Sequence, residues 1–261
     1  MIGGFTAPPT GTDFGERMLN KVVSQSIRHL FSQSESVEVA IRCSPSSKLL
    51  QGSIDNFKMN GRRLVIRRDF WVEEMSFETD AVSIDFSSVL SGKIRLKQPT
   101  QAIAQVVLTE DGINQAFMAE LVKKRLLNID TPELTNLSGG EPVSFTDVNL
   151  QLMPGSQIKI FAKTELPNGS VPISLIASLA VERRRRISFQ NPQFNEDVVP
   201  ETLRGVSRVL TLAFAEILDN MVDLDRFDLD GVTMRINRLE TQGKKLVFSG
   251  YAQIEHFPGN G

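Results

Sequence analysis

Cysteine and histidine are nearly absent from this sequence, and both absences limit its chemistry. Cys43 is the one cysteine, so no internal disulfide can form, which suits a reducing compartment. His29 and His256 are the only histidines and lie far apart in the chain, so no zinc set is visible. We find no G-x-S-x-G motif and no glycine loop that would cradle a phosphate. We therefore expect a protein that is not an enzyme and needs no metal or cofactor.

The sequence also lacks an excess of positive charge. Its formal net charge is −2, which argues against nucleic acid as a partner. The densest basic run, Arg183 to Arg186, has no interleaved exposed aromatics on which bases could stack, and we expect it to lie in a solvated edge strand. The aspartates between Asp219 and Asp230 lack the spacing of an EF-hand calcium loop.

Long apolar runs are missing as well. The longest near-continuous run, Ile173 to Val181, falls well short of the roughly 20 residues that a membrane-spanning helix needs. Residues 1–13 show neither the cationic start nor the apolar core of a signal peptide. We expect 1–13 and 257–261 to be flexible tails, and the protein to be cytoplasmic with at most peripheral membrane contact.

The most apolar stretch of the chain runs from Pro200 to Leu224 and predicts a helix. Its apolar residues recur at helical spacing and cover more than half of the circumference. Such a helix must either pack inside the protein or cover an apolar ligand. The residues concerned are Leu203, Val206, Val209, Leu210, Leu212, Ala213, Phe214, Ile217, Leu218, Met221, Val222 and Leu224.

Two more helices and a series of antiparallel strands complete the prediction. One helix covers 14–31, and another follows Thr109, a suitable N-cap with two carboxylates in the first turn. Residues 70–90 are predicted as one extended segment, and 171–187 as one long strand or two short ones. The dipeptide Asn60–Gly61 is the strongest hairpin signal, because both central positions of a type I′ turn favour positive φ.

The turns suggest an internal repeat. Four share one pattern: NGRRLVI at 60, SGKIRL at 91, PGSQIKI at 154 and QGKKLVF at 242. A helix followed by hairpin strands recurs at roughly 90 residues, although turn chemistry alone could produce the likeness. We predict a single domain, 14–256, with repeat units of about 14–108, 109–199 and 200–256. The fold class is α+β, with a long curved antiparallel sheet wrapped around apolar helices.

Three segments between residues 36 and 190 carry a resemblance to a known family. They are LLQGSIDNFKMNG at 49, VSIDFSSVLSG at 82 and PTQAIAQVVLTEDGIN at 99. In these segments the chain resembles the LmeA-like phospholipid-binding family. The resemblance implies phospholipid binding without catalysis, in a fold akin to the tubular lipid-binding proteins, where a curved sheet and helices enclose an acyl-chain groove.

We expect the lipid to lie between the sheet and the helices. A curved sheet over an apolar helix leaves a gutter that an acyl chain could occupy if side chains do not fill it. For the last helix, an ordinary core role competes with groove lining, because apolar stripes usually just pack. The candidate lipid-binding residues are Val82, Ile84, Phe86, Phe117, Leu121, Leu210, Phe214 and Ile217.

A second set of candidates would dock the protein on an anionic membrane. Each cation near such a surface contributes roughly 1 kcal/mol and is screened by salt. The alternative is that they serve solubility and edge protection. These cations follow predicted hairpin turns and are Arg62, Arg63, Lys93, Lys244 and Lys245.

Two functions therefore remain open. The first is binding or shuttling of phospholipid beside a membrane. The second is a non-catalytic protein-interaction or assembly module that uses the same groove or its edge strands.

Overall fold

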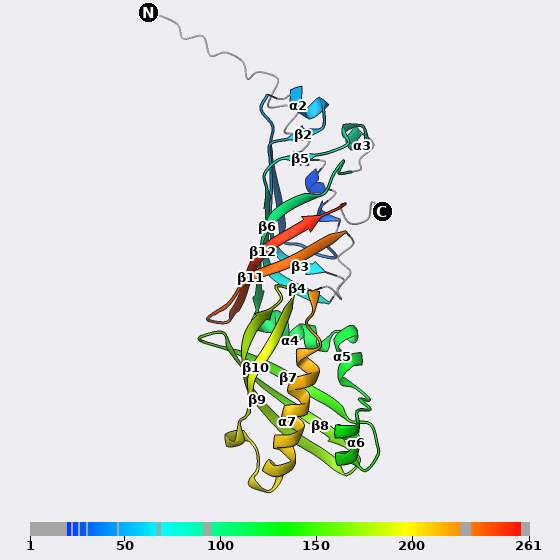
Figure 1. Ribbon diagram of the computed structural model, residues 1–261, viewed down its shortest axis with the longest axis vertical. Coiled ribbons are helices and arrows are strands. Elements are labelled where there is room, and N and C mark those ends of the chain that lie inside the picture. The colour runs from blue at the N-terminus through cyan, green and yellow to red at the C-terminus, as the bar shows by residue number, and fades with distance from the viewer. Residues whose placement is uncertain are drawn as a thin grey trace, which may run out of the picture.

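Two antiparallel sheets, one toward each end of an elongated molecule, define the architecture (Figure 1). A computed structural model describes residues 20–21, 23–25, 27–29, 31–45, 47–66, 69–90, 95–224 and 231–256. Helices pack on both sheets, so the predicted α+β class is confirmed. Residues 1–13 and 257–261, predicted as tails, lie outside the described residues.

Strands from both ends of the chain form the larger sheet. The C-terminal hairpin joins it through an antiparallel register that runs from Thr100 opposite Ile254 to Thr109 opposite Lys245. The sheet is therefore complete only when the C-terminal strands have paired with the strands formed by the first half of the chain. Its strand order is β1 (Ser36–Arg42), β3 (Asn56–Ile66), β4 (Phe70–Thr79), β6 (Thr100–Thr109), β12 (Lys245–Ile254) and β11 (Val232–Gln242).

Side chains of this six-stranded sheet alternate between an apolar and a wet face. In β1, Val37 and Ile41 are buried, whereas Glu38 and Arg42 are exposed. The apolar face is covered by an N-terminal helix, of which residues 20, 21, 23–25, 27 and 28 are described. One end of the sheet carries a small ribbon and two short helices, namely β2 (Ser53–Ile54), β5 (Val82–Ser83), α2 (Ser47–Leu50) and α3 (Phe86–Leu90).

The smaller sheet carries the long apolar helix α7 (Arg204–Asp219). The helix packs on β9 and β10 (Figure 1). Ser207 Oγ donates to Pro172 O at 2.6 Å, and Asp219 Oδ1 accepts from Phe189 N at 2.8 Å, so both ends of the helix are tied to the sheet. The strand order is β10 (Arg186–Phe194), β9 (Gly169–Glu182), β8 (Gln157–Leu166) and β7 (Ser144–Met153), and the turns η1 (Glu196–Val198) and η2 (Glu201–Leu203) precede α7.

Helix α4 (Glu110–Met118) joins the two sheets. Thr109 Oγ1 accepts from Gly112 N at 3.0 Å, which confirms the predicted N-cap. The Asn114 side chain donates to Leu150 O at 3.0 Å and accepts from Leu150 N at 2.7 Å. Because β7 is the last strand of its sheet, these bonds also protect an open edge. Helices α5 (Glu120–Leu126) and α6 (Pro132–Ser138) follow along the chain.

The apolar side chains gather in two main cores. The four-stranded core lies between α7 and the smaller sheet and includes Phe145, Leu150, Ile158, Ile160, Leu175, Leu210, Phe214 and Leu218. The six-stranded core lies on the apolar face of the larger sheet and includes Val23, Ile27, Val37, Ile41, Ile54, Phe57, Val72, Val82, Ile84 and Val106. Each sheet buries most of its own apolar face, and Leu246 of β12 joins the four-stranded core.

The predicted hairpin turn at Asn60–Gly61 is wrong. Both residues lie inside β3, where Gly61 pairs with Val37 on one side and Met75 on the other. The chain reverses later, between β3 and β4. Gly61 is crowded by the buried Leu64 side chain, because an added Cβ would lie 2.7 Å from Leu64 Cδ1 and would force that side chain to move. The glycine is therefore explained by a close side-chain contact within the strand and not by a turn.

The extended segment predicted over 70–90 is only partly correct. It forms β4 and the short β5, but Phe86 begins helix α3. The reason is local, because the Asp85 carboxylate accepts hydrogen bonds from Ser87 N at 3.0 Å and Ser87 Oγ at 2.6 Å. An aspartate just before a helix accepts hydrogen bonds from the free N–H groups of the first turn. In a strand, a neighbouring strand would accept them instead.

The basic run at 183–186 lies only partly in the expected edge strand, because residues 183–185 form a turn and Arg186 begins the edge strand β10. The region 171–187 resolves into two strands, β9 and β10, with Arg183 and Arg184 between them at φ +48° and +60°. The Arg186 guanidinium pairs with Glu182 at 2.7 Å and Asp219 at 3.0 Å. This cation therefore ties the β9–β10 turn to the end of α7.

The other turns test the repeat in part. The turns at Pro154–Gly155 and Gln242–Gly243 do join paired antiparallel strands, as predicted. Residues 91–94 lie outside the described residues, and the turn at 60 is lost. A helix followed by antiparallel strands recurs along the chain, but the division into three units stays a prediction.

Replacing Asn114 by Ala should lower the free energy of unfolding by about 1–3 kcal/mol, because both backbone groups of Leu150 lose their partner. The measurement is urea unfolding followed by circular dichroism. Gln115→Ala, at the exposed neighbouring position of the same helix, serves as control and should change stability by less than about 0.5 kcal/mol. Equal effects of the two changes would contradict the bridging role of Asn114.

Candidate lipid-binding site

The structure divides the predicted lipid-binding residues between the two cores. Leu121 joins neither, because its side chain on α5 is 46% exposed. The six-stranded core takes Val82, Ile84 and Phe86, and the four-stranded core takes Phe117, Leu210, Phe214 and Ile217. The two groups lie against different sheets and cannot line one short groove.

The residues of α7 pack as a core helix. Phe214 is fully buried, and its ring centroid lies 4.7 Å from that of Phe145. Leu210 and Leu218 are buried on the same side, whereas Val209 and Leu212 are exposed. Other side chains of the protein cover the apolar stripe of α7, as expected for an ordinary core helix.

The six-stranded core contains a small apolar cavity. Its volume is about 20 Å³, which is enough for about one water molecule. Val82 and Ile84, both predicted from the sequence, line it. The full lining is Val23, Ile41, Ile54, Phe57, Thr79, Val82, Ile84, Thr100 and Ile254. An acyl chain would fit only if the walls moved apart.

The cavity is walled by segments that are distant in the sequence. The N-terminal helix contributes Val23, and its Asn20 Oδ1 accepts from Ile41 N at 2.9 Å. The β2–β5 ribbon approaches closely because residue 52 is glycine, since an added Cβ would lie 2.0 Å from Ile84 O. Ile254 comes from the last strand. The site therefore exists only in the assembled sheet.

Small residues lie next to the cavity on the same face of the sheet. Ala102 pairs with Ala252, and Ala104 pairs with Gly250, in the neighbouring strands β6 and β12. The three alanines are almost completely buried. We call these four residues the small-residue floor. They leave more depth above the sheet than leucine or isoleucine would, and they are not among the residues predicted from the sequence.

A signal for these missed residues exists in the sequence. Alanines alternate with larger residues, Gln101, Ile103 and Gln105, in TQAIAQ at 100, and a glycine and an alanine alternate with larger residues in SGYAQI at 249. Alternation alone marks one face of each strand. It does not say that the two strands are neighbours, so the floor could not be assembled from the pattern.

The predicted docking cations do not share one hairpin tip. Arg62 and Arg63 lie inside β3, and the Arg63 guanidinium is 3.1 Å from the Glu35 carboxylate. Arg63 has φ +46°, which marks a local irregularity in the strand. Lys93 lies outside the described residues.

The last two docking candidates lie at the β11–β12 turn, and each faces a carboxylate. Lys244 Nζ is 3.4 Å from Glu110 Oε1, and Lys245 Nζ is 3.5 Å from Glu74 Oε1. Glu74 also lies opposite Arg62 in the β3–β4 register, so the structure brings Arg62 and Lys245 to the same carboxylate. Docking by this set stays a prediction.

An ion pair fixes helix α2 beside the cavity. Asp55 follows the cavity-lining Ile54, and its carboxylate accepts from Lys48 Nζ at 2.8 Å and from Ser44 N at 2.7 Å. The hydrogen bond from Lys48, followed by that from Ser44, holds the pKa of Asp55 below its ordinary value of 3.8. The stabilisation is therefore present above pH 3.8 and is lost as the pH falls through the lowered pKa.

Comparison with known proteins identifies one family. The family model for LmeA-like phospholipid-binding proteins matches residues 10–250, a range that contains both sheets except the end of β12. No curated protein matches the chain. None of the helices in the described part of the chain has both the length and the apolar character needed to cross a bilayer.

Removing the Lys48 ammonium should raise the pKa of Asp55 toward 3.8, because its largest stabilising hydrogen bond disappears. Carboxyl NMR titration of Lys48→Ala measures this shift. Lys58→Ala, which removes a lysine paired with Glu78 at 3.2 Å, is the matched control and should leave the Asp55 titration unchanged. An unchanged Asp55 pKa in Lys48→Ala would show that the pair does not form in solution.

Proposed function

Because the chain belongs to the LmeA-like phospholipid-binding family, we propose that it binds a phospholipid without catalysis and holds an acyl chain in the six-stranded core. The observation that carries the location is the apolar cavity of about 20 Å³. It borders the small-residue floor, so the acyl chain would extend from the cavity across Ala102 and Ala252.

The N-terminal helix is the wall of the cavity that the acyl chain would displace. Among its described residues, Val23 and Ile27 are buried, whereas Lys21, Gln25 and Arg28 are exposed. Exposing two aliphatic side chains costs about 3–6 kcal/mol. An acyl chain of about 14 methylenes gains about 11 kcal/mol on burial, before ordering costs. Measured from water, burial of the acyl chain gains more than exposure of Val23 and Ile27 costs, which supports exchange of the helix for the lipid.

The four-stranded core would keep its packing during this exchange. Helix α7 buries Leu210, Phe214 and Leu218 and is tied to its sheet at Ser207 and Asp219. Removing α7 would expose more apolar surface and break these hydrogen bonds. We assign this half of the molecule a supporting role.

The same exchange would allow shuttling of lipid between membranes, because the bound chain is released when the helix returns. The alternative is an assembly module in which a protein segment occupies the same place. Native mass spectrometry of the purified protein, followed by organic extraction, separates the two functions. Bound phospholipid supports the carrier. A lipid-free protein that also takes up no phospholipid from vesicles would overturn it.

A larger side chain in the cavity should block lipid uptake. We expect Val82→Phe to reduce bound phospholipid at least tenfold, because the new ring fills the space that the chain would enter. The measurement is lipid retained after incubation with vesicles, counted by native mass spectrometry.

Phe214→Trp is the matched control, because it enlarges a side chain in the other core. It should lower the free energy of unfolding by about 1–3 kcal/mol and leave lipid retention unchanged. Val23→Phe provides a second change in the cavity wall if Val82→Phe does not fold. Loss of lipid in Phe214→Trp alone would place the acyl chain against α7 instead.

A further inference from the structure

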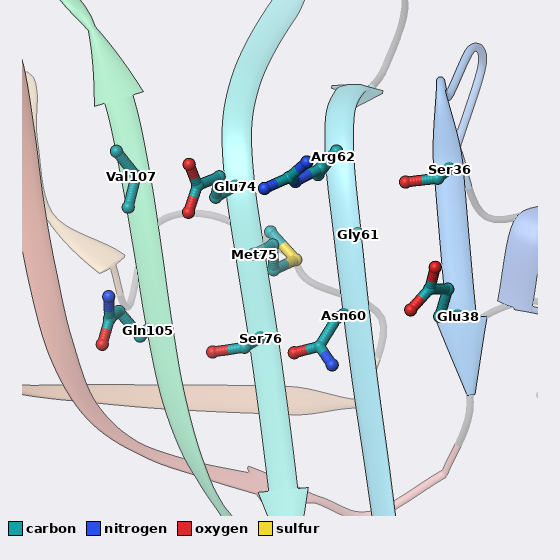
Figure 2. A pocket seen from close by; sticks show the side chains of 10 residues that line it. All are labelled: Ser36, Glu38, Asn60, Gly61, Arg62, Glu74, Met75, Ser76, Gln105 and Val107. Carbon is teal, nitrogen blue, oxygen red and sulfur yellow. The ribbon is translucent and has the colours of Figure 1, made fainter. Parts of the chain in front are cut away.

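The wet face of the six-stranded sheet is hollowed into a second pocket (Figure 2). Its volume is about 480 Å³, within the range of small-molecule sites. It lies on β1, β3, β4 and β6 (Figure 2). The lining residues that carry its chemistry are Ser36, Glu38, Asn60, Arg62, Glu74, Ser76 and Gln105.

Strand register builds this pocket from two rows of side chains. In one row Arg62 lies opposite both Ser36 and Glu74. In the other, Asn60 lies opposite Glu38 and Ser76, and Ser76 in turn lies opposite Gln105. Figure 2 shows Arg62 extending from β3 toward Glu74 on β4. Paired strands therefore hold the polar groups at fixed spacing on one rigid surface.

The pocket is separate from the proposed lipid site, because alternate residues of the same strands face opposite sides. Glu38 and Gln105 line the pocket, whereas their neighbours Val37 and Val106 are buried in the six-stranded core. The sheet itself lies between the two sites. A lipid held in the core could not place its own head group here.

The side-chain chemistry selects the ligand class. The Glu38 and Glu74 carboxylates face the Arg62 guanidinium, and Lys245 Nζ lies 3.5 Å from Glu74 Oε1. The cations are therefore balanced by carboxylates, and the wall offers no excess of positive charge to a phosphate. An acyl chain would leave these polar groups without partners. No group of three or more metal-ligating side chains was found among the described residues. The wall offers carboxylate acceptors, guanidinium donors, and amides and hydroxyls that can do both.

We propose that this pocket binds a neutral, hydroxyl-rich molecule such as a sugar or another polyol. Each hydroxyl both donates and accepts, which matches the mixture of groups that the two rows present. The Glu74 carboxylate and the Arg62 guanidinium provide the stronger, charge-assisted hydrogen bonds on neighbouring strands. This binding requires no bound lipid.

The test is titration of the full chain with glucose, galactose and maltose, followed by amide NMR shifts. At least one sugar should give saturable shifts at Asn60, Ser76 and Gln105, and Glu74→Gln should weaken its binding about tenfold or more. Ser76→Val, at a partly exposed strand position, should also weaken it without loss of the fold.

Glu78→Gln is the matched control, since Glu78 lies on the same face of β4 but outside the pocket lining. It should leave the affinity unchanged. Saturable binding of inorganic phosphate at the same amides, equal weakening by Glu78→Gln, or no saturable shift with any of the three sugars would each overturn the proposal. Sugar binding that persists in Val82→Phe would confirm that the two sites act separately.

Discussion

The pairing of β12 with β6 is the contact on which the rest of the structure depends. It joins the C-terminal hairpin to a strand formed much earlier in the chain, through a register that runs without a break from Thr100 to Thr109. The cost of closing a long loop rises only slowly with its length, so such a distant pairing is not prohibitive. Without it, the sheet would lose Ile254 from the cavity wall and Ala252 from the small-residue floor.

Local chemistry explains how much of the fold could be predicted. The Thr109 cap and the turn at Gly155 depend on nearby residues alone, and both were found from the sequence. Gly61 was misinterpreted because its partner is the Leu64 side chain, which crowds it only after the strand has formed. A glycine in the sequence therefore does not show by itself whether a turn or a close contact accounts for it.

The site was harder to predict, because its walls come from separate parts of the chain. Alternation correctly marked Val82 and Ile84 as apolar-facing, but nothing local places them near Val23 or Ile254. For the same reason, the apolar stripe of α7 could not distinguish a groove from a core. Side chains of the smaller sheet, such as Phe145, fill the space against α7 and make it a core helix.

In the proposed function, unequal attachment of the two helices would determine which part of the molecule accommodates a lipid. Helix α7 is held by a broad buried face and by hydrogen bonds at Ser207 and Asp219, and opening it would break both. Among its described residues, the N-terminal helix has only Val23 and Ile27 buried, and the hydrogen bond at Asn20 ties it to β1. Its displacement would expose Val23 and Ile27 and open the cavity wall that Val23 lines. On the described residues, the N-terminal helix has the smaller buried face, and low local stability is what exchange with a ligand would require.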